Sequence, residues 1–323
     1  MSLETPWVEK YRPNTFEEIV SQNIAIKNLR EFVKTTDIPH LIFTGPAGTG
    51  KTSTALIIAR YFLKEEEFET NLLELNASDT VRIDFVRNIL KNFVNQNLIR
   101  NGAIKFVILD EADNIPGQVQ QALRRIIEKT SNNVKFIFLC NYINKIIDPI
   151  VSRCAVFRFV SLPKESIIDR LKYIIKQEKL KIPPNKGEQF YNQLYFISGG
   201  DLRKAINTLQ MAVALELLEN LDLNEILRIS GFLDEDTLNS LILALKSKNF
   251  KSSKDIIDSV EILDSSNFIR QISEVLPAFS LDPRNLSNLK TYIGEVDYRL
   301  SQGADEKMQI TALLAAIIEN LQG

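Results

Sequence analysis

A glycine-rich stretch near the start of the chain carries the residues best suited to chemistry. Together with the residue after it, the stretch is Gly45-Pro46-Ala47-Gly48-Thr49-Gly50-Lys51-Thr52-Ser53, which matches the pattern G-x-x-x-x-G-K-[ST]. An apolar run precedes it and a helical pattern follows, so backbone N–H groups and the positive end of a helix dipole can surround phosphate oxygens. We expect Lys51 to place its charge on the outer phosphates and the Thr52 hydroxyl to bind Mg²⁺.

A second apolar run ends in carboxylates, because Val107-Ile108-Leu109 leads directly into Asp110-Glu111-Ala112-Asp113. We expect Asp110 to hold Mg²⁺ through its water shell and Glu111 to orient or deprotonate an attacking water. Acidic residues often end strands, so this segment indicates catalysis only in combination with the phosphate loop. Asp113 fits the start of a helix better than a catalytic role.

A third apolar run ends at Leu139-Cys140-Asn141. A lone asparagine is ordinarily a turn residue. At a strand end beside two other polar strand ends, its neutral amide could instead contact the γ-phosphate of ATP and position the water. The three strand ends together predict hydrolysis of a phosphoanhydride through positioning and electrostatics, with ATP and Mg²⁺ bound.

Five short apolar runs, near residues 41–44, 72–75, 106–109, 135–139 and 156–159, alternate with helical patterns. This alternation predicts an α/β domain with a parallel sheet covered by helices on both faces, and such sheets bind ligands at the carboxyl ends of their strands. Strand signals stop after Leu162, and prolines and glycines then interrupt a helical pattern. We therefore predict an ATP-binding domain at 1–162, a small helical lid at 163–230 and an all-helical domain at 231–323.

Composition limits the class of protein. The chain has 323 residues, 45% of them hydrophobic and 25% charged, with a net charge of −2, which indicates a globular multidomain protein and not a general binder of polyanions. Two cysteines, Cys140 and Cys154, and one histidine exclude a disulfide scaffold and an ordinary structural zinc site. We expect a reducing, intracellular location without membrane association. His40, at the start of a strand, is predicted to be structural.

Several longer segments go beyond a general nucleotide-binding pattern. They are Pro6-Trp7-Val8-Glu9-Lys10-Tyr11-Arg12-Pro13, Asn76-Ala77-Ser78-Asp79, Gln120-Gln121-Ala122-Leu123-Arg124-Arg125, Ser152-Arg153-Cys154 and Gly200-Asp201-Leu202-Arg203-Lys204-Ala205-Ile206-Asn207. In order and spacing they resemble the small subunits of replication factor C, the AAA+ sliding-clamp loaders. The match is dense up to about Gly231 and looser beyond it.

The resemblance implies roles that the residue pattern alone does not give. Val8, Arg12 and Val20 would lie near the adenine, and Arg203 would reach the γ-phosphate from the lid. Arg153 would be an arginine finger that acts on ATP held by a neighbouring subunit, a role that suits the permanent charge and forked shape of arginine. Without the resemblance, Arg153 would be interpreted as a surface residue.

The resemblance also implies an activity and a set of partners. The activity would be ATP-driven loading of a PCNA-like sliding clamp onto primer-template DNA during replication. The chain would join a large subunit and other small subunits in a pentamer with a C-terminal collar, in the cytoplasm of an archaeon or the nucleus of a eukaryote. Arg87 and Lys91 would contact the DNA backbone without sequence preference, although a solvated helix face is the alternative. The polar face of the helix near 118–129 would help hold the assembly or would simply be solvated.

Two competing interpretations stay open. A subunit could bind nucleotide and act as a scaffold, but the retention of Lys51, Asp110 and Arg153 argues against that role. Another AAA+ remodeller, such as a branch-migration helicase or an unfoldase, would be expected to carry pore-loop or DNA-tracking elements, and we recognise none. One departure stands out: Val81 and Arg82 replace the arginine and glycine usual in the family, which suggests a divergent small subunit.

Overall fold

The computed structural model describes residues 5–35, 38–77, 89–94, 104–130 and 133–321. Contacts divide the chain into two compact units, Met1–Leu180 with Tyr191–Gln210 and Lys181–Phe190 with Met211–Gly323. The boundaries predicted at 162 and 230 are not tested by this division and stay a prediction.

The first unit is built on a five-stranded parallel sheet. The strands are β1 (His40–Thr44), β2 (Leu72–Asn76), β3 (Lys105–Asp110), β4 (Val134–Cys140) and β5 (Cys154–Arg158). Their order is β2-β3-β4-β1-β5, and every neighbouring pair is parallel. All five predicted strands are confirmed, as is the α/β fold. Because β3, β4 and β1 are adjacent, their three polar carboxyl ends meet at one edge of the sheet.

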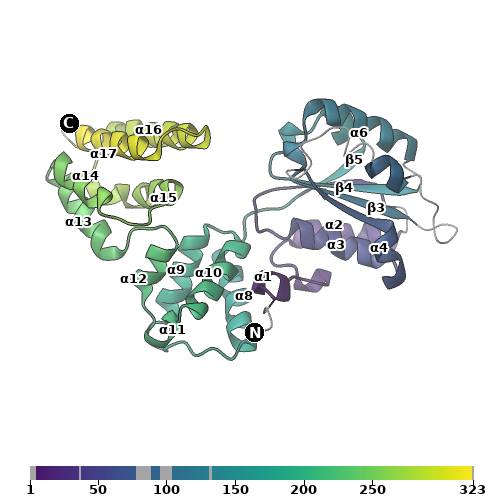
Figure 1. Cartoon of the computed structure of the whole chain (residues 1–323), viewed down its shortest axis with the longest axis horizontal. Coiled ribbons are helices and arrows are strands. Elements are labelled where there is room, and N and C mark those ends of the chain that lie inside the picture. Colours follow the sequence, from purple (N-terminus) through teal and green to yellow (C-terminus); the bar gives the residue numbers. More distant parts are fainter. Residues whose placement is uncertain (1–4, 36–37, 78–88, 95–103, 131–132, 322–323) are drawn as a thin grey trace. The chain divides into compact units, whose positions relative to one another are not determined.

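Helices cover both faces of this sheet (Figure 1). On one face α2 (Asn23–Lys34) and α3 (Lys51–Phe62) bury Leu29 and Ile58 in a common core. On the other face α6 (Gly117–Thr130) buries Val119, Leu123 and Ile127, which are spaced at i, i+4 and i+8 and so form one apolar stripe. The predicted helix at 118–129 is therefore confirmed.

Further elements, short and long, join these layers or lead away from the sheet. They are α1 (Trp7–Lys10), η1 (Phe16–Glu18), η2 (Glu65–Glu67), α4 (Phe68–Asn71), η3 (Ala112–Asn114), η4 (Ile143–Lys145), α7 (Asp148–Val151), α8 (Lys164–Gln177), α9 (Gly187–Ser198) and α10 (Leu202–Ala214). The short helices η3 and η4 follow β3 and β4, so they border the sheet edge where the polar strand ends meet.

His40 is a structural residue, as predicted. It begins β1, is 6% exposed, and its Nδ1 accepts a hydrogen bond from the N–H of Phe136 at 3.1 Å. Burial, with a smaller contribution from the charge of Lys135, lowers the pKa of His40 from 6.5 to about 4. The imidazole is therefore neutral in the folded protein and can accept this backbone hydrogen bond.

The depressed pKa of His40 predicts a loss of stability in mild acid. Its contribution is complete above pH 6.5 and falls as the pH drops from 6.5 toward 4, because the unfolded chain takes up the proton first. We expect this residue alone to lower the free energy of unfolding by about 2 kcal/mol between pH 7.5 and pH 5. Urea unfolding of the natural protein and of His40→Asn at both pH values measures this change in the free energy of unfolding. Asparagine keeps a hydrogen-bond acceptor but does not titrate. Equal pH dependence in both proteins would contradict the prediction.

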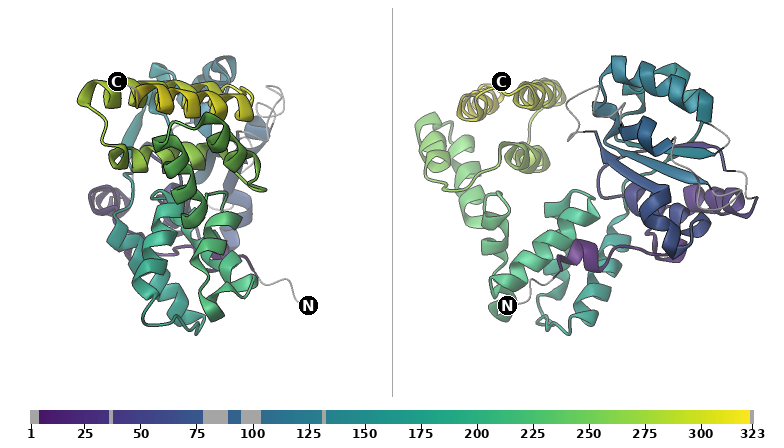
Figure 2. Two further views of the ribbon diagram at one scale, coloured as in Figure 1. Left: turned by 90° about the vertical axis from the view of Figure 1, so that its left-hand side faces the viewer. Right: turned by 45° about the vertical axis from the view of Figure 1, so that its right-hand side comes forward.

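The second unit is helical throughout its described part. Its elements are α11 (Leu217–Asn220), α12 (Leu223–Ile229), α13 (Glu235–Lys246), α14 (Phe250–Asp258), α15 (Ser265–Val275), η5 (Leu276–Phe279), α16 (Pro283–Ser301) and α17 (Glu306–Asn320). The long helices α16 and α17 lie side by side (Figure 2) and bury Leu289 and Leu313 in one core with Phe268 of α15. Among the described residues, no helix is both long enough and apolar enough to cross a bilayer.

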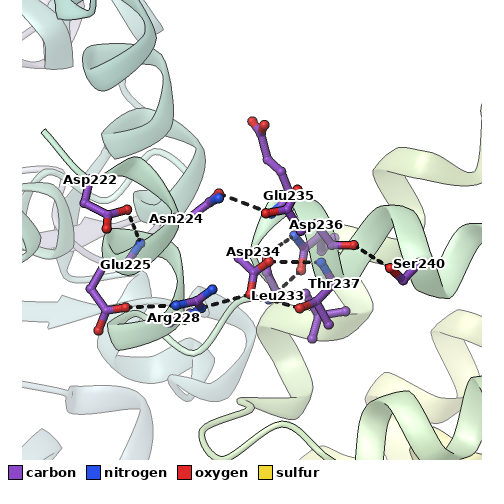
Figure 3. A network of polar contacts seen from close by, with 11 residues as sticks. Asp222, Asn224, Glu225, Arg228, Leu233, Asp234, Glu235, Asp236, Thr237 and Ser240 are labelled. Atoms are coloured by element: carbon purple, nitrogen blue, oxygen red, sulfur yellow. Dashed lines mark hydrogen bonds and ion pairs between the residues drawn. The ribbon is translucent and has the colours of Figure 1, made fainter.

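The turn between α12 and α13 is fixed by charged side chains (Figure 3). Asp234 caps α13 by accepting hydrogen bonds from the N–H and the hydroxyl of Thr237, both at 2.9 Å. The same carboxylate binds Nε of Arg228 at 2.9 Å, and Arg228 also pairs with Glu225 at 3.2 Å. One buried carboxylate thus ties the end of α12 to the start of α13.

Two polar side chains of α15, and the backbone N–H of its N-cap residue Asp264, hold the same turn from the other side. The amide of Gln271 donates to the carbonyl of Leu233 at 2.8 Å and accepts from its N–H at 3.0 Å. The amide of Asn267 donates to the carbonyl of Ser230 at 2.9 Å. Gly231 has φ +75°, and a Cβ there would lie 2.9 Å from the Cβ of Asp264, so this position favours glycine. Residues 230–234 therefore form a fixed corner.

Candidate active site

The phosphate loop joins β1 to α3 in a conformation that depends on its glycines. Gly48 and Gly50 have φ values of +67° and +94°, in the left-handed region. At Gly45, φ is +148° and a Cβ would lie 2.0 Å from the carbonyl oxygen of Phe159, while at Gly48 it would lie 1.8 Å from Oδ1 of Asp201. Only glycine leaves room for the loop to pass this close to its neighbours.

Lys51, the first residue of α3, lies within this loop. Its Nζ donates to the carbonyls of Gly45 and Pro46 at 2.7 and 2.8 Å and to Oδ1 of Asn141 at 3.2 Å. Burial lowers the pKa of Lys51, and the nearby carboxylate of Asp110 acts in the opposite direction. The predicted phosphate-binding lysine and the predicted γ-phosphate-sensing amide are therefore in direct contact.

Thr52 and Asp110 form the candidate metal site. The hydroxyl of Thr52 donates to Oδ2 of Asp110 at 3.1 Å, and Oδ1 of Asp110 accepts from the N–H of Glu111 at 2.8 Å. A hydroxyl and a carboxylate suit Mg²⁺, which usually takes one or two protein oxygens and completes its shell with phosphate oxygens and water. Among the described residues, no group of three or more His, Cys, Asp or Glu side chains could hold a metal ion.

Glu111 follows Asp110 in a left-handed backbone conformation with φ +52°. For a residue with a Cβ this conformation costs about 1–2 kcal/mol. Through this left-handed conformation the backbone turns away from the direction of β3 at Glu111. Oε2 of Glu111 accepts a hydrogen bond from the side chain of Asn114 at 3.3 Å. Glu111 lines the same pocket as Lys51 and Asn141, as a residue that acts on water must.

Asp113 lies at the start of a short helix, as predicted, but it is not the cap of that helix. It lies in the first turn of η3, but Glu111 occupies the cap position of that helix. Its Oδ2 instead accepts hydrogen bonds from the backbone N–H groups of Asn141 and Tyr142 at 3.3 and 3.2 Å. Asp113 therefore links the loop after β3 to the end of β4 and holds the backbone that carries Asn141.

We expect Asp113→Ala to lower kcat for ATP hydrolysis about tenfold with little change in KM, because Asn141 loses its backbone support while the phosphate loop stays intact. Asp113→Asn keeps one acceptor oxygen and should restore most of the rate. Steady-state kinetics of the three proteins test this. An equal loss in both variants, or a loss confined to KM, would show that the backbone support is not what matters.

The N-terminal segment contributes to the lining of the same pocket. Val8, Arg12 and Val20 all line it, together with apolar side chains further along the chain. Those side chains are Ile19, Leu162, Leu202 and Ile206. Arg12 is held by Glu9, whose Oε2 accepts from its Nε at 2.8 Å. These apolar side chains in the pocket lining suit a purine ring.

Two pocket residues in this region were missed by the sequence analysis. Tyr11 and Arg170 line the pocket, and Nη2 of Arg170 donates to the carbonyl of Tyr11 at 2.8 Å. Burial first, and then the carboxylate of Glu178, raises the pKa of Tyr11, so its hydroxyl stays protonated and donates to Glu178. The helical pattern of α8 gave no signal for Arg170, because the contact depends on how the helix packs.

Arg203, the predicted second γ-phosphate sensor, lines the pocket from the first turn of α10. Asp201 accepts hydrogen bonds from the N–H groups of Arg203 and Lys204 at 2.8 and 3.2 Å. Since Asp201 also lies against Gly48, the start of α10 lies close to the phosphate loop. Of the other predicted loop residues, Ala47, Thr49 and Ser53 line the pocket as well, whereas Gly45 and Pro46 are not among its lining residues.

Arg153 and Lys91 lie apart from this pocket, and Arg87 cannot be placed. Arg153, at the turn between α7 and β5, is not among the pocket residues of its own chain. Lys91 is exposed in the helical segment at 89–94, also away from the pocket. Arg87, like Val81 and Arg82, lies outside the described residues.

Comparisons with known proteins place this chain. Residues 41–162 match the family model for the ATPase family associated with various cellular activities, and residues 233–316 match that for the replication factor C C-terminal domain. The chain is 41% identical over 314 residues to replication factor C small subunit 1 of Pyrobaculum islandicum, covering 96% of this chain and 93% of the relative. It is 40% identical over 312 residues to the small subunit of Archaeoglobus fulgidus, covering 96% of both. The chain belongs to the replication factor C small-subunit family.

This membership confirms the predicted family, and the match to an ATPase family supports nucleotide binding by the chain. Solved structures are similar at the level of fold. The Holliday junction branch migration motor RuvB of Thermotoga maritima gives a TM-score of 0.54 at 19% identity, covering 85% of this chain and 94% of that one. This likeness concerns the fold alone, because proteins of one fold can have different activities.

Proposed function

We propose that this chain is an ATP-hydrolysing small subunit of a clamp loader, which loads a sliding clamp onto primer-template DNA during replication. The observation that carries the proposal is the identity of about 40% along nearly the whole chain to replication factor C small subunits. The contacts among Lys51, Thr52, Asp110 and Asn141 support retained catalysis.

In the proposed reaction each pocket residue has a separate task. Lys51 and the loop N–H groups bind the phosphates, and Glu111 orients and deprotonates the attacking water. Asn141 and Arg203 contact the γ-phosphate and stabilise the charge that develops on it. Thr52 and Asp110 would hold Mg²⁺, which neutralises phosphate charge when bound. Val8, Arg12 and Val20 would contact the adenine.

The active site would be completed by a neighbouring subunit. Arg153 is about a third exposed and is absent from the pocket of its own chain. A guanidinium presented at the surface can enter the ATP site of an adjacent subunit and stabilise the transferring phosphoryl group. This role requires an assembly, and we propose a pentamer with a replication factor C large subunit and other small subunits, joined through a collar at 231–323.

DNA would be held through its phosphates. Lys91 is exposed and suits such a contact, and Arg87 is proposed on its place in the sequence alone. Contacts of this kind are independent of sequence and weaken as salt rises. A protein that works on DNA would act inside the cell, where its two cysteines, which form no disulfide, would stay reduced.

The experiment is ATP hydrolysis by the purified chain, alone and with its large-subunit partner, each with and without primed DNA and sliding clamp. We expect DNA and clamp together to stimulate turnover, Lys51→Ala to abolish it and Arg153→Ala to reduce it. Lys254→Ala, which removes another exposed, ion-paired cation, is the control. ATP binding without stimulated turnover would instead support the scaffold interpretation.

A further inference from the structure

The proposed arginine finger shares a carboxylate with a second arginine. Oε1 of Glu128, on α6, accepts from Nη2 of Arg153 at 2.7 Å and from Nε of Arg124 at 2.9 Å. Nη1 of Arg153 donates to the carbonyl of Pro149 at 2.6 Å. Both terminal nitrogens of the Arg153 guanidinium are therefore engaged, one by its own turn and one by a neighbouring helix.

These contacts contribute little to the stability of the fold, but they fix the orientation of the Arg153 guanidinium. The side chains of Arg153 and Glu128 are each 36% exposed, and ion pairs of such exposure are strongly screened by water. An unpaired arginine samples many rotamers, whereas one held at two nitrogens presents its guanidinium in one orientation. The consequence of the pair is therefore the position of the guanidinium and not the folding of the chain.

The helix that supplies Glu128 is itself firmly attached to the segment that leads to Arg153. The buried amide of Gln120, on α6, donates to the carbonyls of Ile115 and Lys145 at 2.9 and 3.0 Å. Its Oε1 accepts from the N–H of Ile147 at 2.8 Å, one residue before α7. Glu128 and Arg153 therefore lie on one framework, so their distance is set by backbone packing.

We propose that Glu128 is a positioning residue for Arg153 and orients its guanidinium for the ATP site of a neighbouring subunit. This inference rests on the proposed role of Arg153 in trans. Glu128 does not touch the nucleotide of its own chain, since it is absent from the pocket lining. It acts by reducing the conformational freedom that Arg153 must lose in the transition state.

The test is steady-state ATP hydrolysis by the complex with the large subunit, primed DNA and clamp. For Glu128→Ala we expect kcat to fall about tenfold with KM for ATP within twofold, because binding of ATP does not involve the finger. Glu128→Gln keeps the acceptor oxygen and should retain most of the rate. Glu295→Ala removes an exposed carboxylate that is paired with Arg299 at 2.9 Å and should change nothing.

Arg153→Ala separates the two proposals. If it slows turnover while Glu128→Ala matches or exceeds the natural protein, the positioning role is wrong and the finger stands. If Arg153→Ala has no effect, the proposed finger itself fails. Should Glu128→Ala not assemble, Glu128→Asp decides: the shorter side chain should slow turnover more than Glu128→Gln does, whereas the reverse order would mean that only charge matters and would overturn the positioning role.

Discussion

Glu111→Gln is expected to lower kcat for ATP hydrolysis on the order of 10²–10³-fold while ATP affinity changes little. The amide has the size of the carboxylate and can still accept the hydrogen bond from Asn114, but it cannot take a proton from water. The phosphate loop, Thr52 and Asp110 keep their contacts, so binding should survive. Single-turnover hydrolysis together with equilibrium binding of a fluorescent ATP analogue measures the two effects separately.

The same substitution at an exposed site is the control for Glu111. Glu295→Gln, on α16, should leave both kcat and affinity unchanged. A drop of less than about threefold for Glu111→Gln would mean that another group activates the water, since loss of a general base normally costs far more. A matching loss of ATP affinity would instead indicate that Glu111 shapes the pocket.

Gly45→Ala is expected to lower the free energy of unfolding by about 3 kcal/mol and to weaken ATP binding. The added Cβ would lie 2.0 Å from the carbonyl oxygen of Phe159 and 2.9 Å from its carbonyl carbon, both fixed backbone atoms. Neither backbone segment can shift easily. The N–H of Gly45 donates to the carbonyl of Cys140 at 3.2 Å, and the N–H of Phe159 donates to the carbonyl of Thr44 at 2.8 Å. Overpacking and backbone strain therefore both destabilise the variant. Urea unfolding measures the change in stability, and nucleotide-binding measurements test the weaker ATP binding.

Gly294 provides the matched glycine for this comparison. It lies inside α16, where an added Cβ would meet no atom within 4 Å. Gly294→Ala should be neutral or should stabilise the protein by up to about 1 kcal/mol, because alanine favours the helix. If Gly45→Ala behaved in the same way, the close approach to Phe159 would have no energetic consequence.

Much of the fold was predictable because its signals are local. Buried parallel strands require continuous apolar runs, and all five were found in this way, as was α6 from its apolar stripe. The order of the strands is not local, since it depends on which edges pair. The prediction that three polar strand ends meet relied on the general rule for parallel sheets, and the order β3-β4-β1 confirmed it.

The pocket was predictable to the extent that a spacing or a family segment marked its residues. Lys51 was found from the spacing of the phosphate loop, and Asp110 and Asn141 were found because each directly follows an apolar run. Arg170 and Tyr11 could not be assigned, because their contacts depend on the packing of α8 and not on any spacing. Asp113 was correctly assigned to a helix start, but its hydrogen bonds to the N–H groups of Asn141 and Tyr142, just after β4, could not be predicted because those residues are distant in sequence.

The fixed corner at 230–234 has a mechanical consequence. A joint can absorb a rotation only if its backbone can change conformation, and here the backbone groups of Ser230, Gly231 and Leu233 are held from α15 or its N-cap. A rotation of α12 should therefore move α13 with it as one rigid body, because the corner between them does not bend. Most of the bonds that hold it involve neutral donors, so its stiffness should change little when salt screens the charges of the complex.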